Sequence, residues 1–285
     1  MGHILTKFHN EKENDNQYSK KSNNGPTDSE ESNSITPVYS VPTESSSLRN
    51  REFHMEEEAS YWLPKDEDEQ LRLMGDMAST FPNCTFDCCD IVDVINTKIM
   101  PGKIKFSYGN LVKGLSYADN TFDFVQIRFF VYALTEKEWP LAIMEALRVT
   151  KVGGLVQLME HDIKDHGDIN PTYQFTDAVH KVSKARGQDT RIGKELERLV
   201  KEIETAKFVQ VESKVCDLSG KNATSRKFAW NWREVASSMM PAVAPHLGLK
   251  TSEDEKHFLK ELANSLKTNK YYYRVYAVIG QKLKD

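Results

Sequence analysis

Hydrophobic and polar positions are most clearly patterned in the middle of the chain. Residues 122–127 and 155–159 are short apolar runs, as expected for strands that are buried on both faces of a sheet. Between them, Thr135 and Glu138 have capping-box spacing and Pro140 follows in the first turn, so a helix should begin just after Thr135. Strand, helix and strand form a right-handed βαβ unit, and such a unit requires a parallel sheet.

Four further segments have strand patterns. Residues 84–89 are an apolar run, and residues 103–108 alternate between apolar and polar side chains. Residues 209–215 alternate in the same way, which is typical of a half-exposed strand at a sheet edge, and residues 271–279 form a long aromatic strand. The six strands and the helices between them predict a three-layer, doubly wound α/β fold.

Helices are predicted in the C-terminal half by their caps. Asp189 and Thr190 precede a helical apolar stripe over residues 192–203. Ser252 and Glu255 have the spacing of a second capping box, which should open a helix with its apolar stripe over residues 258–266.

The N-terminal segment has a different composition. Only six of the 42 residues from 9 to 50 are apolar, which is too few to offset the entropy of ordering the segment. We therefore expect residues 1–50 to be a disordered tail and residues 51–285 to form one domain. Met1-Gly2 followed by Thr6 matches a minimal N-myristoylation pattern, but the pattern is so short that chance is the better explanation.

Composition narrows the function classes. With 39% hydrophobic residues and no apolar run near the roughly 20 residues that span a bilayer, the chain should be a soluble cytoplasmic or nuclear protein. A net charge of -4 argues against a nucleic-acid partner. The four cysteines, Cys84, Cys88, Cys89 and Cys216, lack paired CxxC spacing, so we expect no metal site. We interpret Cys84 and Cys88 as small apolar residues on one face of a strand.

The central unit also resembles a known family. "YADNTFDFVQIR", a capped helix and "EALRVTKVGGLVQLME" resemble the fourth and fifth strands of the class I S-adenosylmethionine-dependent methyltransferases, although Val152 replaces the usual proline before the two glycines. Residues 51–75 resemble the lead-in of a fungal branch that includes regulators of secondary metabolism. The resemblance covers residues 51–284. It implies a Rossmann-like, mostly parallel sheet with an antiparallel last strand, S-adenosylmethionine as cofactor, and a small-molecule or protein methyl acceptor that the sequence does not identify.

The resemblance assigns cofactor contacts to five positions. Asp90, at the end of the second strand, would hold the two ribose hydroxyls, and Ile91 would face the adenine. Asn110, after the third strand, would accept a hydrogen bond from the adenine amino group, although by itself it fits a turn residue better. Leu111 and Arg128 complete the set implied by the family.

No catalytic residue is assigned. Glu160 and His161 follow the fifth strand, at the edge where doubly wound sheets bind ligands, and either could act as a general base. The simpler interpretation is an ordinary polar loop, because many members of the family need no base.

A glycine-rich turn is missing. The cofactor's methionine half normally rests on a GxG turn after the first strand, and none of the 14 glycines here has that spacing. The sequence around Gly75 and Asp76 indicates that the first strand, the turn and most of the next helix are absent, which would leave unpaired groups on both neighbouring strands. We expect impaired cofactor binding, in either a truncated product of an active enzyme or a cofactor-free scaffold that binds another protein. We favour truncation because Asp90 and Asn110 are retained.

Overall fold

The computed structural model describes residues 3–8, 81, 83–91, 104–163, 170–268 and 271–285, with residues 3–8 described by their backbone. Predictions that concern residues 9–80 lie outside this set. They include most of the disordered tail, the lead-in segment and the junction between Gly75 and Asp76.

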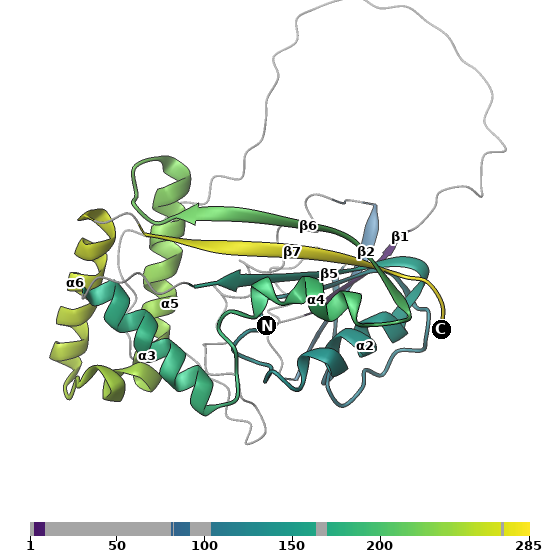
Figure 1. Cartoon of the computed structure of the whole chain (residues 1–285), viewed down its shortest axis with the longest axis horizontal. Coiled ribbons are helices and arrows are strands. Elements are labelled where there is room, and N and C mark those ends of the chain that lie inside the picture. Colours follow the sequence, from purple (N-terminus) through teal and green to yellow (C-terminus); the bar gives the residue numbers. More distant parts are fainter. Residues whose placement is uncertain (1–2, 9–80, 82, 92–103, 164–169, 269–270) are drawn as a thin grey trace, which may run out of the picture.

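One seven-stranded sheet forms the centre of the described structure (Figure 1). All six predicted strands are present, and a seventh is added near the N-terminus. The strands are β1 (His3–Phe8), β2 (Cys84–Asp90), β3 (Ile104–Tyr108), β4 (Phe122–Arg128), β5 (Thr150–Asp162), β6 (Ala206–Asp217) and β7 (Tyr272–Lys282).

The sheet has a doubly wound topology. Its order is β3-β2-β1-β4-β5-β7-β6, which is the doubly wound order 3-2-1-4-5-6 with one strand added between the fifth and sixth. Strand β7 is antiparallel to both β5 and β6, so β2 to β6 all run in one direction. The α/β fold with a mostly parallel sheet and an antiparallel last strand is therefore confirmed.

The central position of the sheet is occupied by β1, which was not predicted. It is antiparallel to both neighbours, with Thr6 opposite Phe86 of β2 and Phe124 of β4. The expectation that β2 and β4 would be left with unpaired edges is therefore wrong, because the N-terminal segment pairs with both. Residues 3–8 lie in this strand, while residues 9–50 lie outside the described part of the chain, where the disordered tail stays a prediction.

The helices divide into two groups. Helix α2 packs against β4 and β5, and α4 packs against β6 and β7. The other three helices pack on one another beyond the carboxyl end of β5 (Figure 1). The bounds are α2 (Trp139–Val149), α3 (Pro171–Ala185), α4 (Leu196–Lys201), α5 (Ala223–Leu247) and α6 (Ser252–Thr268).

The local sequence explains where α2 and α6 begin. The Glu138 carboxylate accepts 2.8 Å hydrogen bonds from the Thr135 backbone N–H and hydroxyl, but this pair closes a turn and α2 begins only at Trp139. At α6 the predicted box is displaced by one residue. Thr251 and Asp254 exchange side-chain-to-backbone hydrogen bonds of 2.9 and 3.1 Å.

The two glycines before the fifth strand form a bulge within β5. The register advances from Phe122 opposite Thr150 to Phe124 opposite Leu155, so the intervening residues loop out. Gly153 has φ +83°, and a Cβ on Gly154 would lie 2.8 Å from the Asp123 carbonyl oxygen. Both positions therefore require glycine, and the strand begins earlier than its apolar run.

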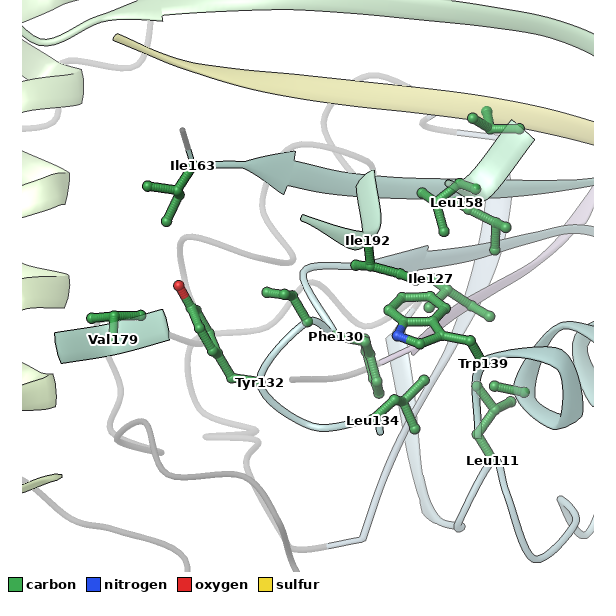
Figure 2. Close-up of a cluster of buried hydrophobic side chains, with 14 of the residues drawn as sticks. Leu111, Ile127, Phe130, Tyr132, Leu134, Trp139, Leu158, Ile163, Val179 and Ile192 are labelled. Carbon is green, nitrogen blue, oxygen red and sulfur yellow. The ribbon is translucent and has the colours of Figure 1, made fainter. Parts of the chain in front are cut away.

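The core joins α2 to the sheet. Trp139 is fully buried and belongs to one cluster with Ile127, Leu134 and Leu158 (Figure 2). The apolar stripe predicted for α2 is confirmed at Trp139, Ile143 and Leu147, which are buried, whereas Met144 is 48% exposed.

Arg148, near the end of α2, anchors the loop before β4. Its guanidinium donates to both carboxylate oxygens of Glu145 at 2.7 and 2.8 Å, to Asp119 at 2.5 Å, and to the carbonyl oxygens of Leu115 and Tyr117. Glu145 in turn accepts the Leu115 N–H at 2.6 Å. Burial opposes ionisation of Glu145, but these hydrogen bonds outweigh it and hold its pKa below the usual value.

Candidate ligand-binding edge of the sheet

The carboxyl ends of β2, β3, β4 and β5 lie at one edge of the sheet, which is where doubly wound folds bind ligands. Asp90 ends β2 and is 5% exposed, while the next residue, Ile91, is 36% exposed. The Asp90 carbonyl oxygen accepts the Gly109 N–H at 2.9 Å, which ties the end of β2 to the end of β3. Asp90 and Asn110 are therefore on adjacent strand ends, as the resemblance requires.

Asn110 has a structural use of its own. Its side-chain oxygen accepts the N–H groups of Val112 and Lys113 at 2.9 and 3.2 Å, which closes a turn. An adenine amino group would compete with these two donors for the oxygen. Leu111 is 4% exposed and part of the core near Trp139 (Figure 2). Its contact with a cofactor, like the roles of the other four residues, stays a prediction.

Arg128 ends β4 on the other side of β1. Its guanidinium carbon lies 6.0 Å from the centre of the Phe129 ring. Phe129 has φ +59°, an uncommon value for an aromatic residue, and its N–H donates to the Met159 carbonyl oxygen at 2.9 Å. The chain thus turns sharply at the end of β4, in the stretch between the strand and the loop that precedes α2.

Glu160 holds this turn in place. Its side chain is fully buried, and its two carboxyl oxygens accept the N–H groups of Phe130 and Val131, the second at 3.4 Å. Burial raises the pKa of Glu160 well above its usual value, and the two N–H donors oppose that shift. In this structure Glu160 joins β5 to the loop after β4, which is a structural role and gives no support for a general base.

His161 lies within a group of aromatic rings. Its ring centre is 6.1 Å from that of Phe129, 5.4 Å from that of Tyr132 and 6.4 Å from that of Tyr273. Trp232 of α5 stacks on Tyr273 at 5.7 Å, which extends the group to the helices beyond the sheet. The group cannot be recognised from the sequence, because its members come from the loop after β4, from β5 and β7, and from α5.

The end of β5 is also held by contacts with the segment around Arg191 and Gly193. The Arg191 side chain donates a 2.8 Å hydrogen bond to Asp162, which is 1% exposed. A Cβ on Gly193 would lie 3.0 Å from the carbonyl oxygens of Glu160 and His161, so only glycine permits this close approach. The acidic residues that follow the predicted fifth strand are thus held within the fold.

The direction of β1 determines at which edge of the sheet the chain leaves this strand. His3 lies opposite Cys89, next to Asp90, whereas Phe8 lies opposite Cys84 at the far end of β2. The central strand therefore enters the sheet at the ligand edge and leaves it at the opposite edge. No strand-to-helix turn can follow β1 at the ligand edge, and this is the position where a GxG turn would have to be.

The described ranges contain neither a candidate metal site nor a candidate membrane-spanning helix. No three His, Cys, Asp or Glu side chains there gather in a way that could hold a metal ion. None of the helices in those ranges is long and apolar enough to cross a membrane.

Comparisons with known proteins find one short sequence match and several solved structures that cover most of the chain. No family model matches the chain. The chain is 42% identical over 57 residues to the probable methyltransferase ltbC of Aspergillus luteorubrus, which is 20% of this chain and 20% of that protein. The match thus spans about a fifth of the curated relative's length. This relative is described as a probable methyltransferase and comes from a fungus, in agreement with the resemblance to a fungal branch of methyltransferases in the sequence.

Solved structures of similar arrangement include methyltransferases. The [4+2]-cyclase SpnF is 17% identical, with 63% of this chain and 57% of that chain covered and a TM-score of 0.36. Phosphoethanolamine N-methyltransferase 2 of Haemonchus contortus is 12% identical (69% and 43% covered, TM-score 0.41). A methyltransferase of Methanosarcina mazei is 18% identical (69% and 81% covered, TM-score 0.39).

Proposed function

We propose that this chain derives from an S-adenosylmethionine-dependent methyltransferase and that, with its present sequence, it binds the cofactor weakly or not at all. One observation carries the proposal: a doubly wound sheet of the expected order has a central strand that runs in the wrong direction. The order supports the origin, and the direction of β1 supports the impairment.

The residues fit one half of the cofactor and not the other. Asp90 offers a carboxylate at the ligand edge, which suits the two ribose hydroxyls, and Asn110 offers an amide oxygen that its own turn already uses. For the methionine half, the sequence contains no GxG, and β1 leaves the sheet at the opposite edge. We therefore assign no methyl-transfer step to this chain. The acceptor class stays a small molecule or a protein.

Isothermal titration of the full chain with S-adenosylhomocysteine tests the proposal. We expect no saturable heat at micromolar ligand concentrations, whereas low-micromolar binding would contradict the impairment. Any weak binding that is detected should fall about tenfold in Asp90→Asn, because one charge-assisted acceptor of the ribose is lost. Asp87→Asn is the matched control, since Asp87 lies on the same strand opposite Lys105 and away from the edge.

A catalytically inactive scaffold is the second candidate. The observation that favours it is the completed sheet: β1 pairs with both β2 and β4, so the described strands need no glycine turn to form a continuous sheet. Limited proteolysis and pull-downs with the purified full chain separate the two. A protease-resistant domain with a reproducible partner supports a scaffold. Rapid cleavage within the domain and no partner favours a truncated product.

A further inference from the structure

Strand β6 is a long, exposed sheet edge. It is the last strand in the sheet order, and among the described strands none pairs with its outer side. Its seven residues from 209 to 215 are all exposed, although β6 is paired with β7 along its inner side. Edge strands are usually protected from pairing by short length, proline, a bulge or charged side chains. Strand β6 is 12 residues long and contains no proline, its bulge lies at residues 208–210, and the segment 211–215 carries one acidic and one basic side chain, Glu212 and Lys214.

The side chains of β6 are complementary to themselves. If two copies of β6 pair in antiparallel fashion about a twofold axis at Ser213, each Val211 lies opposite the Val215 of the other copy. In the same register each Glu212 lies opposite Lys214. One face of the paired strands then carries four valines, and the other face carries two ion pairs, each between Glu212 of one copy and Lys214 of the other.

The groups required for this pairing are available. Val211 and Val215 are 37% and 46% exposed. The Glu212 carboxylate accepts a 3.2 Å hydrogen bond from the Gln210 amide on the same strand, and Lys214 forms no ion pair within the described ranges. Both charges can therefore turn to a partner without breaking a buried interaction.

We propose that β6 pairs with β6 of a second copy of this chain, antiparallel about Ser213, so that two seven-stranded sheets form one continuous sheet. A second copy is the occupant because the register that matches the valines also matches both charges, and the twofold axis makes the contact close on itself. Main-chain hydrogen bonds between the two outer edges would supply the pairing, as they do when a strand adds to a sheet.

Sedimentation and light scattering of the full chain over a range of concentrations test the proposal. We expect a dimer that weakens as salt increases, because its ion pairs are exposed. Glu212→Lys places a lysine opposite Lys214 at two positions, and Lys214→Glu places glutamate opposite glutamate, so each variant should dimerise about tenfold more weakly or worse.

Charge exchange makes the test specific to the register. The double variant Glu212→Lys/Lys214→Glu restores both ion pairs and should dimerise like the original chain. An equimolar mixture of the two single variants should form a heterodimer, because lysines of one copy then face glutamates of the other. The matched control is Glu253→Lys/Lys256→Glu on α6, which exchanges the same charges at an exposed pair away from β6 and should leave dimerisation unchanged.

Three results would overturn the proposal. They are a monomer at every concentration, a dimer that both single variants leave unchanged, and a double variant that fails to regain dimerisation. Unfolding midpoints are measured for all variants. They should agree with that of the original chain at a protein concentration where all are monomeric, because the substituted side chains are exposed.

Discussion

At the residue scale, the polar groups of the ligand edge are mostly committed to the fold. Glu160, Asn110 and Asp162 each bind a backbone N–H group or a side chain that belongs to the same edge. Buried acids of this kind are often interpreted as catalytic, since perturbed pKa values gather at active sites. Here Glu160 has a buried partner for each carboxyl oxygen, so its first measurable effect should be on stability.

Glu160 should make the chain less stable as pH rises. Its folded pKa is raised above the usual 4.5, so its protonated form contributes stability that is fully present below pH 4.5 and is lost as pH rises through the folded pKa. Thermal unfolding of the original chain and of Glu160→Gln between pH 5 and 8 measures this loss. The variant keeps an acceptor for Phe130 and should lack this decline, whereas parallel curves would contradict the role.

Arg148 should contribute more to stability than an exposed arginine. Arg148→Ala removes the donors that hold Glu145, Asp119 and two carbonyl oxygens, and should cost about 1 to 3 kcal/mol in chemical unfolding. Arg198→Ala is the control, because Arg198 also binds two acids but is 56% exposed. It should leave the unfolding midpoint nearly unchanged. Equal losses in the two variants would show that the loop before β4 does not depend on Arg148.

At the element scale, β1 is the strand on which the sheet's continuity depends. It pairs on both sides, with six register positions on β2 and three on β4. Without it, two strands in the middle of the sheet would have unpaired N–H and C=O groups. The short N-terminal segment therefore has a structural role that its composition does not suggest.

Thr6→Pro should destabilise the chain strongly. Proline lacks the N–H group and is not tolerated in a central strand, and Thr6 faces both β2 and β4 in the register. We expect a loss of cooperative unfolding, or a clearly lower midpoint, by circular dichroism. The control is Ser34→Pro, in the segment that the sequence predicts to be disordered. Identical midpoints for Thr6→Pro and the original chain would place β1 outside the stable sheet.

At the scale of the whole molecule, the described strands form one continuous sheet, and its central strand, β1, leaves that sheet at the edge opposite Asp90. Strand β1 fills the central position of the sheet, but it is antiparallel to β2, so its last residue lies at the edge opposite Asp90 and no turn after β1 lies beside Asp90. A parallel strand in the same position would leave the sheet at the ligand edge. The two arrangements exclude each other, because only one strand can lie between β2 and β4.

Insertion of a parallel first strand and a GxG turn between Gly75 and Asp76 should therefore give the chain cofactor binding and displace β1. The turn supplies N–H donors and a helix N-terminus for the cofactor. Titration with S-adenosylhomocysteine should show tighter binding to the inserted form than to the original chain, and hydrogen exchange should show residues 3–8 losing protection. The same insertion with both glycines replaced by valine is the control. Binding by both forms, or by neither, would contradict the prediction.

The sequence alone determined the local elements. Apolar periodicity located β2 to β7, and the chemistry of Thr135 and Glu138 located the start of α2 to within a few residues. These features depend on neighbours in the chain, so a single sequence contains them. The place of Asp90 at the end of β2 followed in the same way, because strand ends are local too.

Only the tertiary structure decided which segment fills the centre of the sheet and in which direction. Six residues such as His3–Phe8 have no stability as an isolated strand, and their pairing comes from β2 and β4, which lie about 80 and 120 residues away in sequence. The role of Glu160 was hidden for the same reason, since its partners follow another strand. Pairing between distant segments depends on which edges are vacant in three dimensions, and local periodicity does not contain that information.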